Sequence, residues 1–218
     1  MDNKTHVYFM PGLAASSKIF EHIRLPKDKY ELHFLEWLVP ESINETIESY
    51  CKRLAEHITH KNPVLIGVSF GGMIVQELGK IIPTKKIVVI SSIKSNSEMP
   101  KHFYFLQKTR FYKLFPSGRI SKLNRFPTFG LNRSLKRKIE LYNKYLAVRN
   151  KTYLDWAIYN VLHWKIEKSL TNVIHIHGSK DEIFPVKYIK NSILIEGGTH
   201  AMIITKAKKI SYKLEELV

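Results

Sequence analysis

The strongest chemical signal in the chain is the run Gly-Val-Ser-Phe-Gly at residues 67–71, which places Ser69 between two glycines. It directly follows a short apolar run, residues 64–66, and it precedes a segment with helical character. A strand, a sharp turn and a helix are the setting in which a serine hydroxyl stands exposed at the carboxyl edge of a parallel sheet. The positive helix N-terminus beneath the serine favours developing negative charge. The pattern therefore predicts a nucleophilic serine.

Two later segments fit the same arrangement. Asp181 follows the apolar run at residues 173–177, and His200 follows the run at residues 193–195. Together with the serine motif, this order resembles the α/β-hydrolase family, in which serine, acid and histidine follow successive strands. The resemblance implies that His200 takes the serine proton and that Asp181 holds the imidazole in its reactive tautomer. Glu182, the neighbour of Asp181, is the alternative acid.

A third resemblance concerns the run Pro11-Gly12-Leu13, which follows the first β-rich segment. It is similar to the oxyanion loop of the same family, although many members have His-Gly where this chain has Pro-Gly. The resemblance implies that the backbone N–H groups of Leu13 and Phe70 bind the developing oxyanion, with Ala14 as a rival donor. The chain opens on this strand, without the two leading antiparallel strands of the family, which indicates a minimal version of the fold.

Short apolar runs alternate with helical patterns, which is typical of a parallel sheet with helical crossovers. Strands are expected at residues 6–10, 30–37, 64–66, 87–90, 173–177 and 193–195, and helices at 16–24, 73–82, 136–148, 152–164 and 205–217. The prediction is one α/β domain with a mostly parallel sheet of about six strands and helices on both faces. The resemblance implies the spatial strand order 2-1-3-4-5-6, counted from the first strand.

A further helix is predicted behind the run Ser-Ile-Asn-Glu at residues 42–45, which has the form of a capping box. Apolar residues then recur at helical spacing as far as Ile58, and they give the helix one apolar face. Cys51 lies beside that face and is interpreted as a small packing residue. As the single cysteine of the chain, it cannot form an intramolecular disulfide, so a reducing, cytoplasmic setting is expected.

The alternation stops in the middle of the chain. Residues 97–169 are predicted to form a helical lid on a core made of residues 1–96 and 170–218. Between Lys101 and Lys165 stand fifteen lysines and arginines against the acids Glu140 and Asp155, so this stretch carries +13 of the formal net charge of +16. This charge either favours anionic substrates or forms a solvated outer face; we favour the solvated face, because charge runs usually are solvated.

The predicted lid is also rich in aromatic residues, which we interpret as anchors of the lid and walls of an apolar acyl pocket. They are Phe103, Tyr104, Phe105, Phe111, Tyr112, Phe115, Tyr153, Trp156, Tyr159 and Trp164. Aromatic and basic residues together also occur on surfaces that stack single-stranded nucleic acid, but no nucleic-acid-binding signature accompanies them. His175 and His177 share one face of a strand and are interpreted as structural rather than as a metal pair, since no third ligand lies near them in sequence.

The function expected from these residues is hydrolysis of a carboxylic ester or thioester through an acyl-Ser69 intermediate, on a small-molecule acyl substrate. The chemistry requires no metal and no organic cofactor. One alternative uses the same three residues for acyl transfer, carbon–carbon bond hydrolysis or a lyase step, and another is a non-catalytic ligand- or partner-binding protein on a hydrolase scaffold. No apolar run approaches the roughly 20 residues of a membrane span. The substrate and the oligomeric state do not follow from the sequence.

Overall fold

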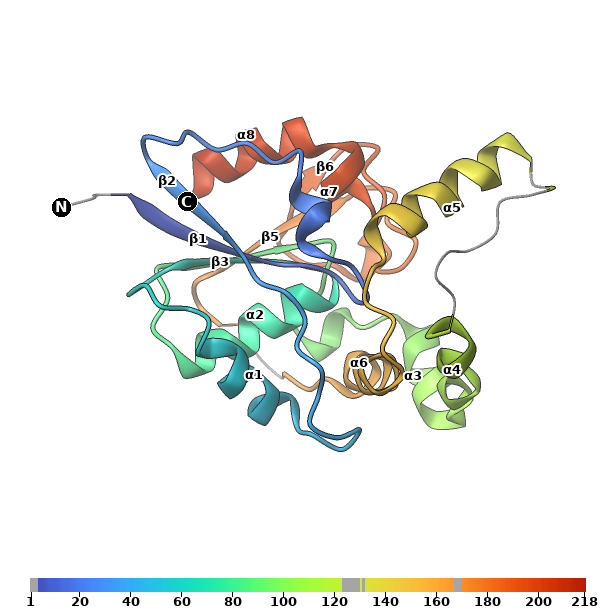
Figure 1. The fold of residues 1–218 in the computed structure, drawn as a ribbon. Coiled ribbons are helices and arrows are strands. Elements are labelled where there is room, and N and C mark those ends of the chain that lie inside the picture. The colour runs from blue at the N-terminus through green and yellow to red at the C-terminus, as the bar shows by residue number, and fades with distance from the viewer. Residues whose placement is uncertain (1–3, 123–129, 131, 167–169) are drawn as a thin grey trace.

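The computed structural model of the chain describes residues 4–122, 130, 132–166 and 170–218. Within this part of the chain the centre is a six-stranded sheet in the order β2-β1-β3-β4-β5-β6, and every neighbouring pair is parallel (Figure 1). The strands are β1 (Thr5–Met10), β2 (Tyr30–Phe34), β3 (Val64–Val68), β4 (Lys86–Ile90), β5 (Val173–Gly178) and β6 (Ile193–Ile195). The α/β class and the predicted strand order are confirmed.

Helices cover both faces of the sheet, which explains why its central strands are unbroken apolar runs. Strand β3 is buried along its whole length. One face carries α1 (Ile47–Ala55) and α2 (Phe70–Ile81), and the other carries the 3-10 helix η1 (Ser17–Phe20), α7 (Met202–Thr205) and α8 (Ala207–Leu217), as Figure 1 shows. Each face packs its own hydrophobic cluster against the sheet. The only cysteine, Cys51, is buried in one of these clusters.

The predicted capping box at residues 42–45 is wrong, because Thr46 rather than Ser42 is the N-cap of α1. The Thr46 hydroxyl accepts a hydrogen bond from the Ser49 N–H at 3.1 Å. Glu45, the expected partner of Ser42, instead binds the Arg53 guanidinium through both carboxylate oxygens, at 2.9 and 2.8 Å. A bidentate arginine–carboxylate pair is stronger than a neutral capping bond, so the more distant partner determines the conformation of Glu45.

Two predicted elements are shorter than expected. The strand predicted over residues 30–37 ends at Phe34, because Leu35 and Trp37 turn into the core beside α1 and α2. The helix predicted over residues 16–24 is the four-residue 3-10 turn η1. Both differences lie next to the loop after β1, where the chain follows tertiary contacts rather than a regular repeat.

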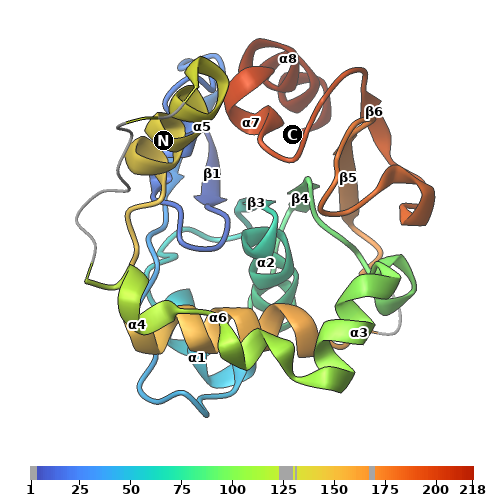
Figure 2. The same cartoon turned by 90° about the vertical axis from the view of Figure 1, so that its right-hand side faces the viewer.

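The helices that join β4 to β5 form an insertion. They are the 3-10 turns η2 (Asn96–Glu98) and η3 (Phe111–Leu114) with α3 (Lys101–Thr109), α4 (Ser117–Ile120), α5 (Arg133–Tyr145) and α6 (Lys151–His163). Seen onto the carboxyl edge of the sheet, α5 lies near the end of β1, while α6 lies in front of α1 (Figure 2). Residues 123–129, 131 and 167–169 of the predicted lid lie outside the described residues.

Helix α5 is attached to the core at its C-terminal end through Glu21, which follows η1. The Glu21 carboxylate pairs with Lys144 and accepts a hydrogen bond from the Tyr145 hydroxyl at 2.6 Å. The hydrogen bonds from Lys144 and then Tyr145 lower the pKa of Glu21 to about 2. Glu21 therefore stays ionised over the neutral and mildly acidic range, which favours its contacts with α5.

The basic residues of the insertion face outward wherever the structure describes their side chains, apart from the partly buried Arg149. The exposed ones are Lys101, Lys108, Arg110, Lys113, Arg119, Lys122, Arg133, Lys136, Lys144, Lys151 and Lys165. Arg125 lies outside the described residues. In the described part of the chain, no helix is long and apolar enough to span a membrane.

At Gly71 the start of α2 closely approaches the backbone at the end of β1 and in the loop after it. A Cβ built on Gly71 would lie 2.3 Å from the carbonyl oxygen of Pro11 and 2.4 Å from that of Met10. Both are backbone atoms at the end of a central strand, so they cannot rotate away as a flexible side chain would. Only glycine fits this contact.

We expect Gly71→Ala to lower the free energy of unfolding by about 3 kcal/mol or more, because the added methyl group forces the turn away from β1. Urea unfolding measures the change. The matched control is Gly118→Ala in α4, where the new Cβ would meet only side-chain atoms of Lys151, at 3.7 and 3.8 Å. That variant should stay within about 1 kcal/mol of the wild type. Equal destabilisation by the two substitutions would contradict the argument.

Candidate active site

Ser69 lies in the sharp turn between β3 and α2, where its backbone adopts φ 54° and ψ −121°. Such a conformation costs a non-glycine residue of order 1–3 kcal/mol and persists only where the surroundings fix it. Here the Ser69 N–H donates to the carbonyl of Ile90 at 2.9 Å. The Ser69 carbonyl accepts from the N–H of Gly72 at 2.9 Å and from the hydroxyl of Ser92 at 2.7 Å. The end of β4 and the start of α2 therefore hold the turn from two sides.

His200 joins Ser69 to Asp181. Its Nε2 is 2.9 Å from Ser69 Oγ, and its Nδ1 is 2.9 and 3.1 Å from the two carboxylate oxygens of Asp181. An ionised carboxylate only accepts hydrogen bonds, so Nδ1 carries the hydrogen and Nε2 is the acceptor for the serine hydroxyl. The structure thus brings together the three residues that the sequence analysis singled out. Glu182, the alternative acid, is exposed and has no hydrogen bond to His200 among the described residues.

Asp181 is only 4% exposed, and its environment favours the ionised form. Burial is the largest single influence and opposes ionisation, but the hydrogen bond from His200, the N–H of Phe184 and the neighbouring imidazoles together outweigh it. The pKa of Asp181 therefore lies below its usual value. One carboxylate oxygen accepts the backbone N–H groups of Ile183 and Phe184, both at 2.9 Å. These bonds hold the carboxylate toward His200.

His175 and His177 of β5 form a hydrogen-bonded pair next to Asp181. His177 Nε2 lies 2.8 Å from the Phe184 carbonyl oxygen, and His177 Nδ1 lies 3.0 Å from His175 Nε2. The carbonyl oxygen only accepts, so Nε2 of His177 donates to it and Nδ1 accepts from His175. Burial lowers the pKa of both rings, most strongly that of His175, which keeps the pair neutral. His177 thus fixes the same Phe184 peptide segment whose N–H binds Asp181.

The loop after β1 lies beside the serine, as the oxyanion prediction requires. A Cβ built on Gly12 would lie 3.4 Å from the Cβ of Ser69. In the described part of the chain, no hydrogen bond engages the N–H of Leu13 or of Phe70. The N–H of Ala14, the rival donor, is occupied by the hydroxyl of Tyr153 at 3.1 Å. Leu13 and Phe70 therefore remain the candidate donors.

The insertion and the segment after β2 hold this loop in place. Ala14 has φ 60°, and its carbonyl accepts the N–H of Val148 at 3.0 Å, in the connection between α5 and α6. The Trp37 indole N–H donates to the Gly12 carbonyl at 3.0 Å. The ring of Trp37 also packs against that of Tyr153, 5.2 Å between centroids. The residues that shape the candidate oxyanion loop therefore come from segments far apart in the sequence.

The ten aromatic residues singled out in the predicted lid divide into four groups, and one of them, Phe103 alone, is connected to His200 through the ring of Phe184. Tyr153, Trp156 and Trp164 are buried core anchors, whereas Tyr104, Phe105 and Phe111 are exposed. Tyr112, Phe115 and Tyr159 line a cavity of about 870 Å³ beside α4 and α6, which Ser69 does not line. Phe103 packs edge-on against Phe184, with centroids 5.5 Å apart, and Phe184 lies 5.7 Å from the His200 ring. Among the aromatic residues of the insertion that the structure describes, Phe103 is thus the one linked by ring contacts to the catalytic candidates.

Four residues that shape the site carry no local signal in the sequence: Trp37, Ser92, Tyr153 and Phe184. Each acts through a partner that is distant in the chain or through its own backbone, as when the Ser92 hydroxyl holds the carbonyl of Ser69. Hydrogen bonds of this kind depend on the tertiary packing, and no fixed spacing between residues in the sequence predicts them.

The chain resembles known proteins in its three-dimensional structure rather than in its sequence. No protein-family model matches the chain, and no curated protein matches it either. Solved structures do match over nearly the whole chain at low sequence identity.

One is a lipase-esterase related protein from Clostridium acetobutylicum, with a TM-score of 0.62 and 20% identity, covering 100% of this chain and 96% of that one. Another is a bromoperoxidase from Bacillus anthracis, with a TM-score of 0.67 and 16% identity, covering 98% and 91%. A third comes from work on epoxide hydrolases of the α/β-hydrolase superfamily in metagenomes from hot environments, with a TM-score of 0.70 and 10% identity, covering 100% and 91%. Together with the parallel sheet and the strand order, these likenesses establish that the chain has the α/β-hydrolase fold.

Proposed function

We propose that the chain is a serine hydrolase that cleaves a carboxylic ester or a thioester through an acyl intermediate on Ser69. The observation that carries this proposal is the continuous set of hydrogen bonds from Ser69 Oγ through His200 to the buried Asp181, at 2.9 Å on each side of the imidazole. The name of the lipase-esterase related protein from Clostridium acetobutylicum is consistent with ester chemistry.

The proposed reaction begins when Ser69 Oγ attacks the carbonyl carbon and its proton moves to His200 Nε2. The imidazolium that forms is stabilised by the Asp181 carboxylate, which accepts the Nδ1 hydrogen. His200 then gives the proton to the leaving alcohol or thiol as the carbon–oxygen or carbon–sulfur bond breaks. Water, deprotonated by His200, attacks the acyl group and restores the serine hydroxyl.

The negatively charged oxygen of each tetrahedral intermediate would bind the N–H groups of Leu13 and Phe70. Phe70 is the first residue of α2, so its N–H belongs to the positive end of the helix dipole. One such donor is worth about 3–4 kcal/mol in comparable sites. Trp37 and Tyr153 bind the backbone of the loop that carries Leu13, which supports a donor that is held in position before the substrate binds.

The first prediction is that a fluorescent fluorophosphonate labels the wild type and that Ser69→Ala and His200→Ala abolish the labelling. Only a serine activated by a neighbouring base reacts rapidly with this reagent, so the test needs no knowledge of the natural substrate. Gel fluorescence against time gives the rate.

The control is His22→Ala, a histidine whose side chain is 54% exposed and which lies outside the site. This variant should label like the wild type. A folded wild type that is not labelled would refute the serine-hydrolase proposal and favour a binding protein on the same scaffold.

The second prediction concerns Tyr153→Phe, which removes the hydroxyl that binds the Ala14 N–H. A buried donor without a partner costs about 1–3 kcal/mol, and part of this cost should appear as movement of the loop that carries Leu13. We expect the labelling rate and the kcat on a model ester to fall about 10-fold, with little change in KM.

The matched control is Tyr50→Phe. Its hydroxyl is likewise bonded to backbone groups, the N–H and carbonyl of Leu38, but it does not touch the loop after β1. Tyr50→Phe should lose a similar amount of stability and retain its labelling rate. Equal rate losses in the two variants would show that Tyr153 has no special connection with the site.

The third prediction concerns pH. The pKa of Asp181 is lower in the folded chain than its usual value of 3.8, so its contribution to stability is present above that value. The contribution is lost as the pH falls through the folded pKa. The difference in unfolding free energy between the wild type and Asp181→Asn should therefore be largest above about pH 5 and shrink below about pH 4.

Urea unfolding from pH 3 to pH 7 measures this difference, with Asp28→Asn as the exposed control. Asp28→Asn should change stability by less than about 0.5 kcal/mol, as is usual for surface substitutions. A gap between wild type and Asp181→Asn that does not vary with pH would contradict the proposed ionised state.

A further inference from the structure

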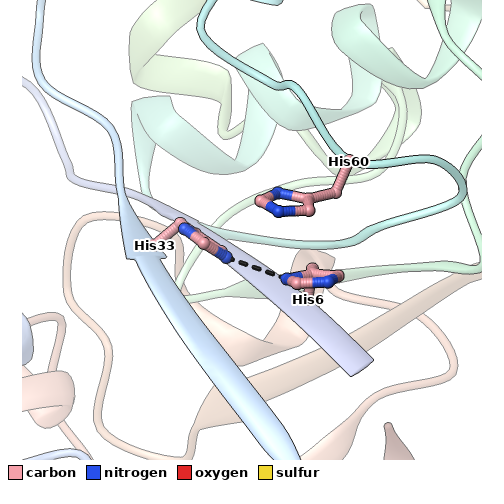
Figure 3. A group of neighbouring side chains, drawn as sticks. All are labelled: His6, His33 and His60. Carbon is pink, nitrogen blue, oxygen red and sulfur yellow. Dashed lines mark hydrogen bonds between the residues drawn. The ribbon is translucent and has the colours of Figure 1, made fainter. Parts of the chain in front are cut away.

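Three histidines gather on one side of the sheet, away from the candidate active site. His6 is the second residue of β1, His33 lies in β2, and His60 lies in the loop that leads into β3. Figure 3 shows the three rings grouped around one small space between the strand pair and the loop. One nitrogen from each ring can be chosen so that all three lie within 4.8 Å of one another.

The strand register explains this meeting. His6 pairs with Glu31 across β1 and β2, and Tyr8 pairs with His33. Residues two apart in a strand point to the same face, so these four side chains share one face of the strand pair. His60 reaches the same face from the loop before β3. The cluster therefore lies toward the amino ends of β1 and β3, whereas Ser69 follows the carboxyl end of β3.

The distances are close to those of a metal site. His6 Nδ1 and His33 Nε2 are 3.1 Å apart. Two ligand nitrogens of a tetrahedral zinc ion are about 3.3 Å apart, given zinc–nitrogen bonds of about 2.0–2.1 Å. The Glu31 carboxylate lies beside the same two nitrogens, 3.6 Å from His6 Nδ1 and 3.8 Å from His33 Nε2. Three imidazoles and a carboxylate are a donor set that suits zinc and its transition-metal neighbours rather than magnesium or calcium.

The orientation of His60 has the support that metal-binding histidines usually have. Its Nδ1 is 2.7 Å from the Tyr8 hydroxyl, which leaves Nε2 for an ion. A hydrogen bond to the second ring nitrogen fixes the ring and its tautomer in most metal sites. The ring of His60 stacks on that of His6, with centroids 3.5 Å apart.

We propose that His6, His33 and His60 bind one divalent transition-metal ion of the zinc class, with Glu31 as an oxygen ligand. Binding one ion requires the His60 ring to rotate out of its stack on His6 until one nitrogen of each ring points at a common centre, and the partial exposure of all three side chains allows this movement. The ion would tie the edge strand β2 to β1 and to the loop before β3. This site is separate from the acyl chemistry proposed for Ser69 and does not depend on it.

The test is isothermal titration of the full chain, freed of metal by a chelator, with zinc chloride. The wild type should bind one ion per chain, and cobalt chloride should give the intense visible absorption of a tetrahedral nitrogen–oxygen site. Loss of outer-shell support alone typically weakens metal binding 10–100-fold, so His33→Gln and His60→Gln should each raise the Kd by about 100-fold or more. Tyr8→Phe should raise it by about 10-fold.

Two controls locate the ion. His22→Gln alters an exposed histidine outside the cluster, and His200→Gln removes the accessible histidine of the candidate active site; both should bind zinc like the wild type. Retained circular dichroism would show that the His33 and His60 variants are folded, whether or not the chain is a serine hydrolase. Absence of stoichiometric binding by the wild type, or unchanged affinity in both folded cluster variants, would overturn the proposal, as would loss of binding in His200→Gln alone.

Discussion

The backbone conformation of Ser69 is the constraint on which the rest of the site depends. A residue with φ 54° and ψ −121° relaxes unless its neighbours prevent it. The neighbours here are the carbonyl of Ile90, the hydroxyl of Ser92 and, through Gly71, the backbone at the end of β1. Because β1, β3 and β4 all end at this point, a shift of one strand by a single residue would release the turn. The position of the Ser69 hydroxyl therefore depends on the register of the central strands.

The insertion is part of the site rather than a separate cover. Tyr153 of α6 is fully buried, its hydroxyl binds Ala14, and its ring lies between Trp37 and Trp156. Moving α6 away from the sheet would leave the Ala14 N–H without a partner and expose three large aromatic surfaces. Each buried aromatic side chain is worth several kcal/mol, so such a movement is strongly unfavourable. Helix α6 is therefore a fixed part of the structure around the loop that carries Leu13.

Local patterns determine what the sequence predicts well. The apolar run at residues 64–66 and the glycines around Ser69 specify strand, turn and helix by themselves, and Asp181 and His200 follow strands in the expected order. Contacts between distant segments were not predictable in this way. Ser42 fails as a cap because Glu45 has a better partner in Arg53.

The same limit applies to the hydrogen bond between Tyr153 and Ala14 and to the histidine cluster, neither of which the sequence analysis identified. Tyr153 and Ala14 are 139 positions apart, and His6 and His33 are 27 apart. No helical or strand repeat relates residues at such separations, since these repeats extend over a few residues only. Strand register places His6 near His33, and the packing of α6 places Tyr153 on the loop. Register and packing are properties of the assembled sheet, and this is why these residues become visible only in three dimensions.

Exposed and buried charges have different effects in this chain. The exposed ones act on association with other molecules, and the buried one acts on the proposed chemistry. The basic side chains described in the insertion are nearly all exposed, and at physiological ionic strength the field of an exposed charge decays over about 8 Å. Such charges act on the encounter with an anionic molecule and lose that effect as salt is added. The Asp181 carboxylate is buried against His200, where water and salt screen the interaction far less. The net charge of +16 therefore affects which molecules approach the protein, whereas the reactivity proposed for Ser69 depends on the buried carboxylate of Asp181.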